Sequence, residues 1–194
     1  TFTGANPSLT LNNKATAAYS SGNRTSTHVF KYTVSSGEDI GNLGVSKIVS
    51  DGTSWADTAT SDSFTPILPA SGSSNSLESS RNICVDTVSP KIESITAISS
   101  NGYYKEGDSI ILKMTFSENV DVDGVSNLAL VFSHQNNSSP VTTDSATVTG
   151  SKTILFTYTV ASGDNASPLT ISSISNSGVT ITDEAGNALV WTLP

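Results

Sequence analysis

Apolar and polar residues alternate along many short segments of this chain. The clearest alternations are Ile110, Leu112, Met114, Phe116; then Leu128, Leu130, Phe132; then Ile154, Phe156, Tyr158, Val160; and finally Leu169, Ile171, Ser173. A period of two residues is that of a half-buried strand, and no stretch keeps the 3.6-residue period of an amphipathic helix. Strands at about ten-residue spacing with turn residues between them predict an all-β fold, a β-sandwich with immunoglobulin-like connections.

The chain also contains an internal repeat. Residues 30–39 (FKYTVSSGED) match residues 156–165 (FTYTVASGDN) at an offset of 126 positions. The same offset aligns Gly52 with Gly178 and Asp57 with Asp183. So many ordered matches indicate two homologous units, which we expect to be two immunoglobulin-like sandwiches at residues 1–87 and 88–194.

Neither unit covers a complete period of the repeat. The first lacks a counterpart of residues 91–118, its opening strands, and the second lacks a counterpart of residues 70–85, its closing strand. Missing strands leave unpaired backbone groups, so we expect other copies or neighbouring repeats to donate strands head-to-tail. The alternatives are a chain cut from a longer repeat protein, or strands that reclose within the chain. The absence of an initial Met and of a signal-like segment favours a processed product or an excised fragment.

Composition narrows the function classes. The chain has 194 residues, 35 of them Ser and 25 Thr, and its net charge is −8. Nucleic-acid binding needs clustered cations, which nine Lys and Arg do not supply. We expect no membrane span, because no apolar run approaches about 20 residues. A single Cys excludes an internal disulfide, and the acidic Ser/Thr-rich composition favours a secreted or surface-attached bacterial protein.

Several segments together resemble tandem bacterial immunoglobulin-like (cadherin-like) repeats of large surface proteins and adhesins. These segments are 85–90 (VDTVSP), 104–108 (YKEGD), 116–120 (FSENV), 156–164 (FTYTVASGD) and 182–189 (TDEAGNAL). They cover most of residues 83–194, and a weaker version covers residues 1–82, where the Gly-Asn turn is missing at residues 57–60. The resemblance implies a non-catalytic extracellular stalk, in some cases stiffened by calcium, and names no particular ligand.

Calcium is the candidate cofactor. It prefers six to eight oxygen ligands, which loops at one end of a sandwich can provide. The strand order is expected to bring Asp86 and Glu118 to the same end, with Asp121 and Asp123 in the loop that follows and Asp183 in a returning turn. The alternative is a set of solvated loop acids, with Asp86 or Asp183 capping a turn.

Four aromatic residues are candidates for carbohydrate binding, because an exposed ring can stack on a sugar. They are Trp55, Trp191, Tyr103 and Tyr104, and the corresponding alternative function is a lectin-like module that binds glycans of a host or cell surface. Packing in a core or corner is the competing interpretation of each.

The sequence gives no sign of an enzyme. His28 and His134 are the only histidines, and we expect both to have surface or packing roles. No Gly-x-Ser-x-Gly segment is present, and the adjacent acids of residues 38–39 and 183–184 cannot face each other across a cleft as a glycosidase pair must.

Overall fold

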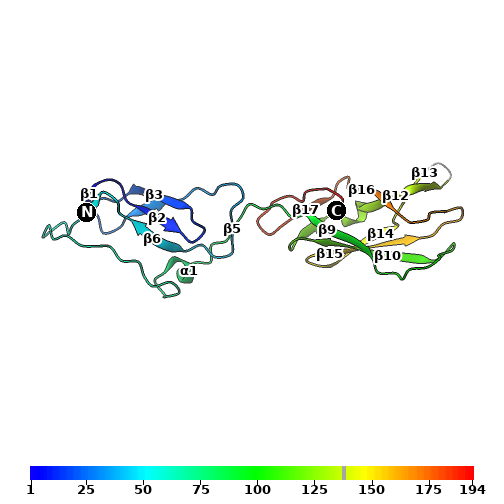
Figure 1. The fold of residues 1–194 in the computed structure, drawn as a ribbon, viewed down its shortest axis with the longest axis horizontal. Coiled ribbons are helices and arrows are strands. Elements are labelled where there is room, and N and C mark those ends of the chain that lie inside the picture. The colour runs from blue at the N-terminus through cyan, green and yellow to red at the C-terminus, as the bar shows by residue number, and fades with distance from the viewer. Residues whose placement is uncertain (137–138) are drawn as a thin grey trace. The chain divides into compact units, whose positions relative to one another are not determined.

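A computed structural model describes residues 1–136 and 139–194 of the chain. The chain divides into two compact units, Thr1–Val88 and Ser89–Pro194 (Figure 1). Strands dominate both units, and the helical segments are single turns, so the predicted all-β fold is confirmed.

The first unit has eight strands and one short helix. They are β1 (Phe2–Gly4), β2 (Ser8–Leu11), β3 (Thr16–Ser21), β4 (Val29–Lys31), β5 (Asp39–Ile40), β6 (Val45–Val49), β7 (Thr53–Trp55), α1 (Leu77–Ser80) and β8 (Val85–Asp86). The main sheet has the order β4-β3-β2-β6, and two antiparallel pairs, β1-β7 and β5-β8, accompany it. The 29 residues between β7 and β8 contain no strand.

The second unit is built from longer strands. They are β9 (Ile92–Ala97), β10 (Ser109–Phe116), β11 (Asp121–Asp123), the 3-10 turn η1 (Val125–Asn127), β12 (Ala129–Asn136), β13 (Ser139–Thr142), β14 (Ser145–Gly150), β15 (Thr153–Thr159), β16 (Ile171–Ser175) and β17 (Thr180–Thr182). One sheet has the order β14-β15-β10-β9 and another the order β13-β12-β16, while β11 pairs with β17. All of these ladders are antiparallel.

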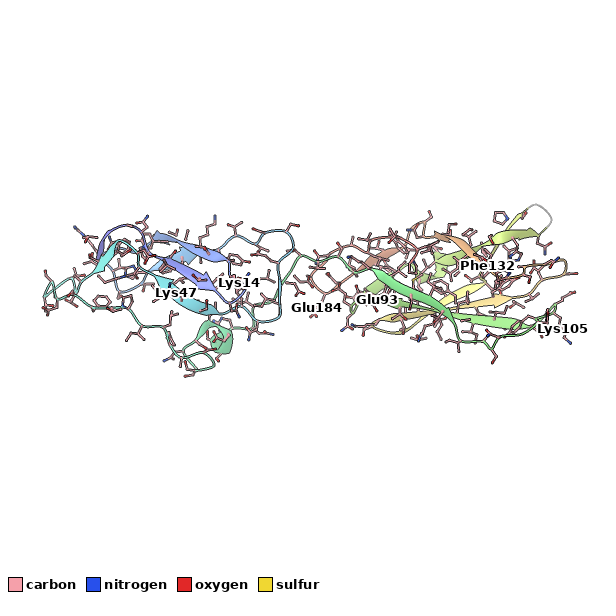
Figure 2. All side chains as sticks on the ribbon, viewed as in Figure 1. Lys14, Lys47, Glu93, Lys105, Phe132 and Glu184 are labelled. Carbon is pink, nitrogen blue, oxygen red and sulfur yellow. The ribbon has the colours of Figure 1, made fainter. Side chains whose placement is uncertain are left out.

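The core of the second unit explains why these segments are strands. On β10 every second side chain is buried, and β12 and β15 bury alternate side chains as well. Phe132 of β12 lies among these core side chains (Figure 2). The buried apolar residues of this core are Ile92, Ile110, Leu112, Met114, Phe116, Val120, Leu128, Leu130, Phe132, Ile154, Phe156, Tyr158, Ile181 and Leu189. Burial of each such side chain contributes roughly 1.5–3 kcal/mol, so this face-to-face packing holds the sandwich together.

The first unit has a much smaller core. Its main cluster of buried residues is Leu11, Ala17, Leu43 and Val85. Phe30 and Tyr32 only partly reach it, although their repeat counterparts Phe156 and Tyr158 are almost fully buried. Within residues 1–88, no strand lies beside β4 in the place that β10 takes beside β15.

A close backbone crossing recurs in both units and confirms part of the repeat alignment. Gly124 has a φ of 73°, and a Cβ atom there would lie 2.3 Å from the carbonyl oxygen of Gly178. Gly4 has a φ of 88°, and a Cβ atom there would lie 2.1 Å from the carbonyl oxygen of Gly52. Both the left-handed backbone and the lack of space require glycine. The predicted correspondence of Gly52 and Gly178 is therefore a shared structural position.

Candidate functional site

The strongest polar constellation of the second unit surrounds Asp164, in the loop after β15. The Tyr158 hydroxyl donates a hydrogen bond to Asp164 Oδ2 at 2.5 Å, and the Ala161 amide donates to the same oxygen at 2.7 Å. Asn136 Nδ2 donates to Asp164 Oδ1 at 2.8 Å and to the Ser162 carbonyl oxygen at 2.8 Å. We call this arrangement the tyrosine–acid clasp. It ties the loop back onto the strand that precedes it.

The first unit builds a second clasp at the equivalent place. The Tyr32 hydroxyl donates to Glu38 Oε2 at 2.5 Å, and the Ser35 amide donates to the same oxygen at 2.6 Å. Asn13 Nδ2 donates to the Tyr32 hydroxyl oxygen at 3.0 Å and to Glu38 Oε1 at 3.4 Å. The repeated segment of residues 30–39 and 156–165 therefore encodes the same tie in each unit.

Hydrogen bonding in the clasps sets the charge of their acids. Burial alone would raise the pKa of Asp164, but hydrogen bonds from Tyr158, Ala161 and Asn136 outweigh burial and lower that pKa. The pKa of Glu38 is lowered first by the Ser35 amide and then by Tyr32. Burial and the neighbouring Asp164 carboxylate raise the pKa of Tyr158. Each clasp therefore joins a neutral phenol to a carboxylate near neutral pH, which suits a structural tie.

His134 stands next to the clasp of the second unit. Its Nε2 atom lies 3.9 Å from Asp164 Oδ1, too far for a hydrogen bond, and neither ring nitrogen has a hydrogen-bond partner among the residues that the structure describes. Its ring packs near Phe132 and Tyr158, with centroids 5.9 and 6.4 Å away. His28 packs against Phe2 and Trp55 in the first unit. Both histidines thus take packing positions.

The calcium candidates of the second unit separate into two groups. Carboxylate oxygens of Glu118, which follows β10, and Asp183, which follows β17, lie within 4.8 Å of each other. Asp121 and Asp123 were expected in a loop, but they lie on β11 with exposed side chains, opposite Thr182 and Thr180 of β17. The expectation fails because the Val122 side chain between them packs against the core and so extends the strand.

Asp183 also organises its own turn. Its Oδ1 atom accepts the Asn187 amide at 2.8 Å, and its Oδ2 atom accepts Asn187 Nδ2 at 2.8 Å. Burial alone would raise the pKa of Asp183, but the hydrogen bonds from the turn lower it, so the buried side chain is a carboxylate. Glu184, at the tip of this turn, is exposed (Figure 2). Asp183 accepts hydrogen bonds from the Asn187 side chain and from the backbone amides of residues 185–187, so a cation would share its oxygens with the turn. The donor atoms of Glu118 and Asp183 are all oxygens, the ligand type that calcium prefers.

Asp86 belongs to the first unit. It lies on β8 opposite Asp39 of β5, and its Oδ1 atom accepts the Val88 amide at 2.9 Å. Asp86 therefore caps the turn that ends this unit, which is one of the two roles considered for it.

The aromatic candidates differ widely in exposure. Trp55 is buried at 8% exposure, and Trp191 is half-buried against the core of the second unit. Tyr103 is fully exposed, whereas the hydroxyl of half-buried Tyr104 donates to the Ser100 carbonyl oxygen at 2.5 Å. Trp55 nevertheless lines a cleft of about 280 Å³ together with Phe64, which is half exposed.

Comparisons with protein-family models, with curated proteins and with solved structures found no match to this chain. Among residues 1–136 and 139–194, no helix has the length and apolar character needed to cross a membrane.

Proposed function

We propose that this chain is a structural repeat module of an extracellular bacterial fibre or adhesin, whose task is to extend and to carry load. The observation that carries the proposal is that one construction occurs twice. Each unit has a tyrosine–acid clasp at equivalent repeat positions, and each has a glycine crossing that includes Gly52 or its repeat counterpart Gly178. A repeated scaffold whose polar side chains are occupied by internal hydrogen bonds suits a load-bearing module better than an enzyme.

The ladder of the second unit supports load-bearing. β10 pairs with β15 over seven residue positions and with β9 on its other side. These backbone bonds lie above a closely packed core, and the clasp fastens the end of β15. A force along the chain must break several of these backbone hydrogen bonds at once, so the unit resists unfolding under load.

Single-molecule force spectroscopy on the full chain tests the proposal. We expect two separate unfolding events, each releasing a contour length of about 3.6 Å per residue of its unit. Leu130 is fully buried, so Leu130→Ala should lower the force of the longer event alone. Extension of the chain without a force peak would contradict a load-bearing function.

The proposed partners are neighbouring repeats and other copies, joined by β-strand complementation, with calcium as the proposed cofactor. Glu118 and Asp183 would hold the calcium ion, which would relieve the repulsion between their carboxylates. Asp86 stays a calcium candidate on the sequence alone. Secretion to the bacterial surface completes this proposal.

One observation favours a second candidate function, a lectin-like module. The cleft beside Trp55 and Phe64 offers apolar ring surface, and Tyr103 offers an exposed ring elsewhere in the chain. Glycan-array binding that is lost in Phe64→Ala or in Tyr103→Ala would support carbohydrate recognition. Absence of binding on a broad array, or binding by both variants that is as strong as that of the unchanged chain, would contradict this second function.

A further inference from the structure

The strand β4 of the first unit has an open edge. It is the outermost strand of the sheet β4-β3-β2-β6, with β3 on one side and no strand on the other within residues 1–88. Its side chains are also incompletely covered, because Val29 is 48% exposed and the following Val34 is 46% exposed. An open edge with apolar side chains readily pairs with another strand.

The second unit shows what covers the same position there. β15, the repeat counterpart of β4, pairs with β10 on one edge and with β14 on the other. With both neighbours present, Ile154 and Phe156 are fully buried and Tyr158 is 3% exposed. The corresponding residues of the first unit, His28, Phe30 and Tyr32, are only partly buried. This difference in burial indicates that the first unit has no counterpart of β10 beside β4.

We propose that the free edge of β4 accepts an antiparallel strand homologous to β10, supplied by a further repeat of this kind. This inference rests on the proposed repeat-module function and adds the acceptor edge, the donor pattern and the register. The donor strand carries apolar side chains at alternate positions, as Ile110, Leu112 and Met114 do in β10. These side chains would complete the small core of the first unit.

The register follows from the repeat. In the second unit, Ile110 lies opposite Tyr158, Leu112 opposite Phe156 and Met114 opposite Ile154. At the offset of 126, the acceptor positions are Tyr32, Phe30 and His28. The donor position equivalent to Lys113, which lies opposite Leu155, therefore falls opposite Val29.

A peptide of residues 107–118 from this chain, made soluble by added terminal lysines, serves as the donor probe for the full-length chain. A photo-crosslinking side chain at the Lys113 position reports the register. We expect saturable binding, a higher melting midpoint of the first unit, and crosslinks concentrated at residues 28–30. A control peptide with Leu112→Asp and Met114→Asp should bind more than about tenfold more weakly, because burial of its apolar side chains is lost.

Three outcomes would overturn the inference. They are equal binding of the two peptides, crosslinks on β6 or β15 instead of β4, and a dimer of the chain that forms without the peptide and keeps the peptide from β4. The last result would identify a second copy as the occupant. Peptide binding at β4 in a chain that extends without force peaks would leave the inference standing while refuting the load-bearing function, so the two proposals fail separately.

Discussion

Replacing Tyr158 by Phe removes one oxygen atom and leaves the aromatic ring in the core of the second unit. The lost hydroxyl donates to Asp164 Oδ2 at 2.5 Å, and the side chain of Asp164 is only 4% exposed. A hydrogen bond to a charged group contributes about 1.5–3 kcal/mol. Asp164 keeps the hydrogen bonds from Ala161 and Asn136, so we expect a loss of about 2 kcal/mol from the unfolding free energy of this unit.

Hydrogen exchange followed peptide by peptide in the mass spectrometer can test this value, because it reports each unit separately. A loss of about 2 kcal/mol makes the opening of β15 roughly 30-fold more frequent, while the first unit is unaffected. Tyr103→Phe is the matched control, since it removes the same atom from a fully exposed ring of the same unit. Exchange of β15 at the same rate in the two variants would refute the reasoning that the clasp stabilises the unit.

Three further predictions follow from the second unit. Because hydrogen bonds lower the pKa values of Asp164 and Asp183, their stabilisation is present above the unfolded-state pKa of about 3.9 and is lost as pH falls through the lower folded-state values. The melting midpoint should therefore drop steeply below about pH 4, and a shallow profile would contradict this. Gly124→Ala should cost more than about 2 kcal/mol in urea unfolding, against about 1 kcal/mol for Gly186→Ala, where the backbone is also left-handed but the space is open. Chelation of calcium should lower the melting midpoint of the chain but not of its Glu118→Gln variant; equal midpoints with and without chelator would exclude a metal at this acid.

The alternation of apolar and polar residues predicted the long strands, because burial of one face of a strand determines both the sequence pattern and the structure. A strand with one face against a core must place apolar residues at every second position, and β10, β12 and β15 meet this requirement. A separate inference, that the loop after Glu118 continues through Asp121 and Asp123, was wrong. The two acidic side chains favour a loop, yet the side chain of Val122 between them packs against the core, and this is enough to form a three-residue strand.

The tyrosine–acid clasps were beyond prediction from sequence, although the segments that carry them were found as the repeat. Alignment shows that Tyr and an acid recur, but not that the hydroxyl turns back to the carboxylate. The amide partner is even less visible, because Asn136 is 28 residues from Asp164 in the chain. Likewise, nothing in the sequence distinguishes the buried Trp55 from the exposed Tyr103, since exposure depends on which strands surround a ring.

The two clasps use different parts for one task, which limits how the units can exchange segments. Asn13 follows β2 by two residues and serves Glu38, whereas Asn136 ends β12 and serves Asp164. A chimaera that joined the N-terminal part of one unit to the C-terminal part of the other would pair the asparagine of one clasp with the acid of the other. That acid would be one methylene too long or too short. Chimaeras of these repeats should therefore take the asparagine and its acid from the same unit.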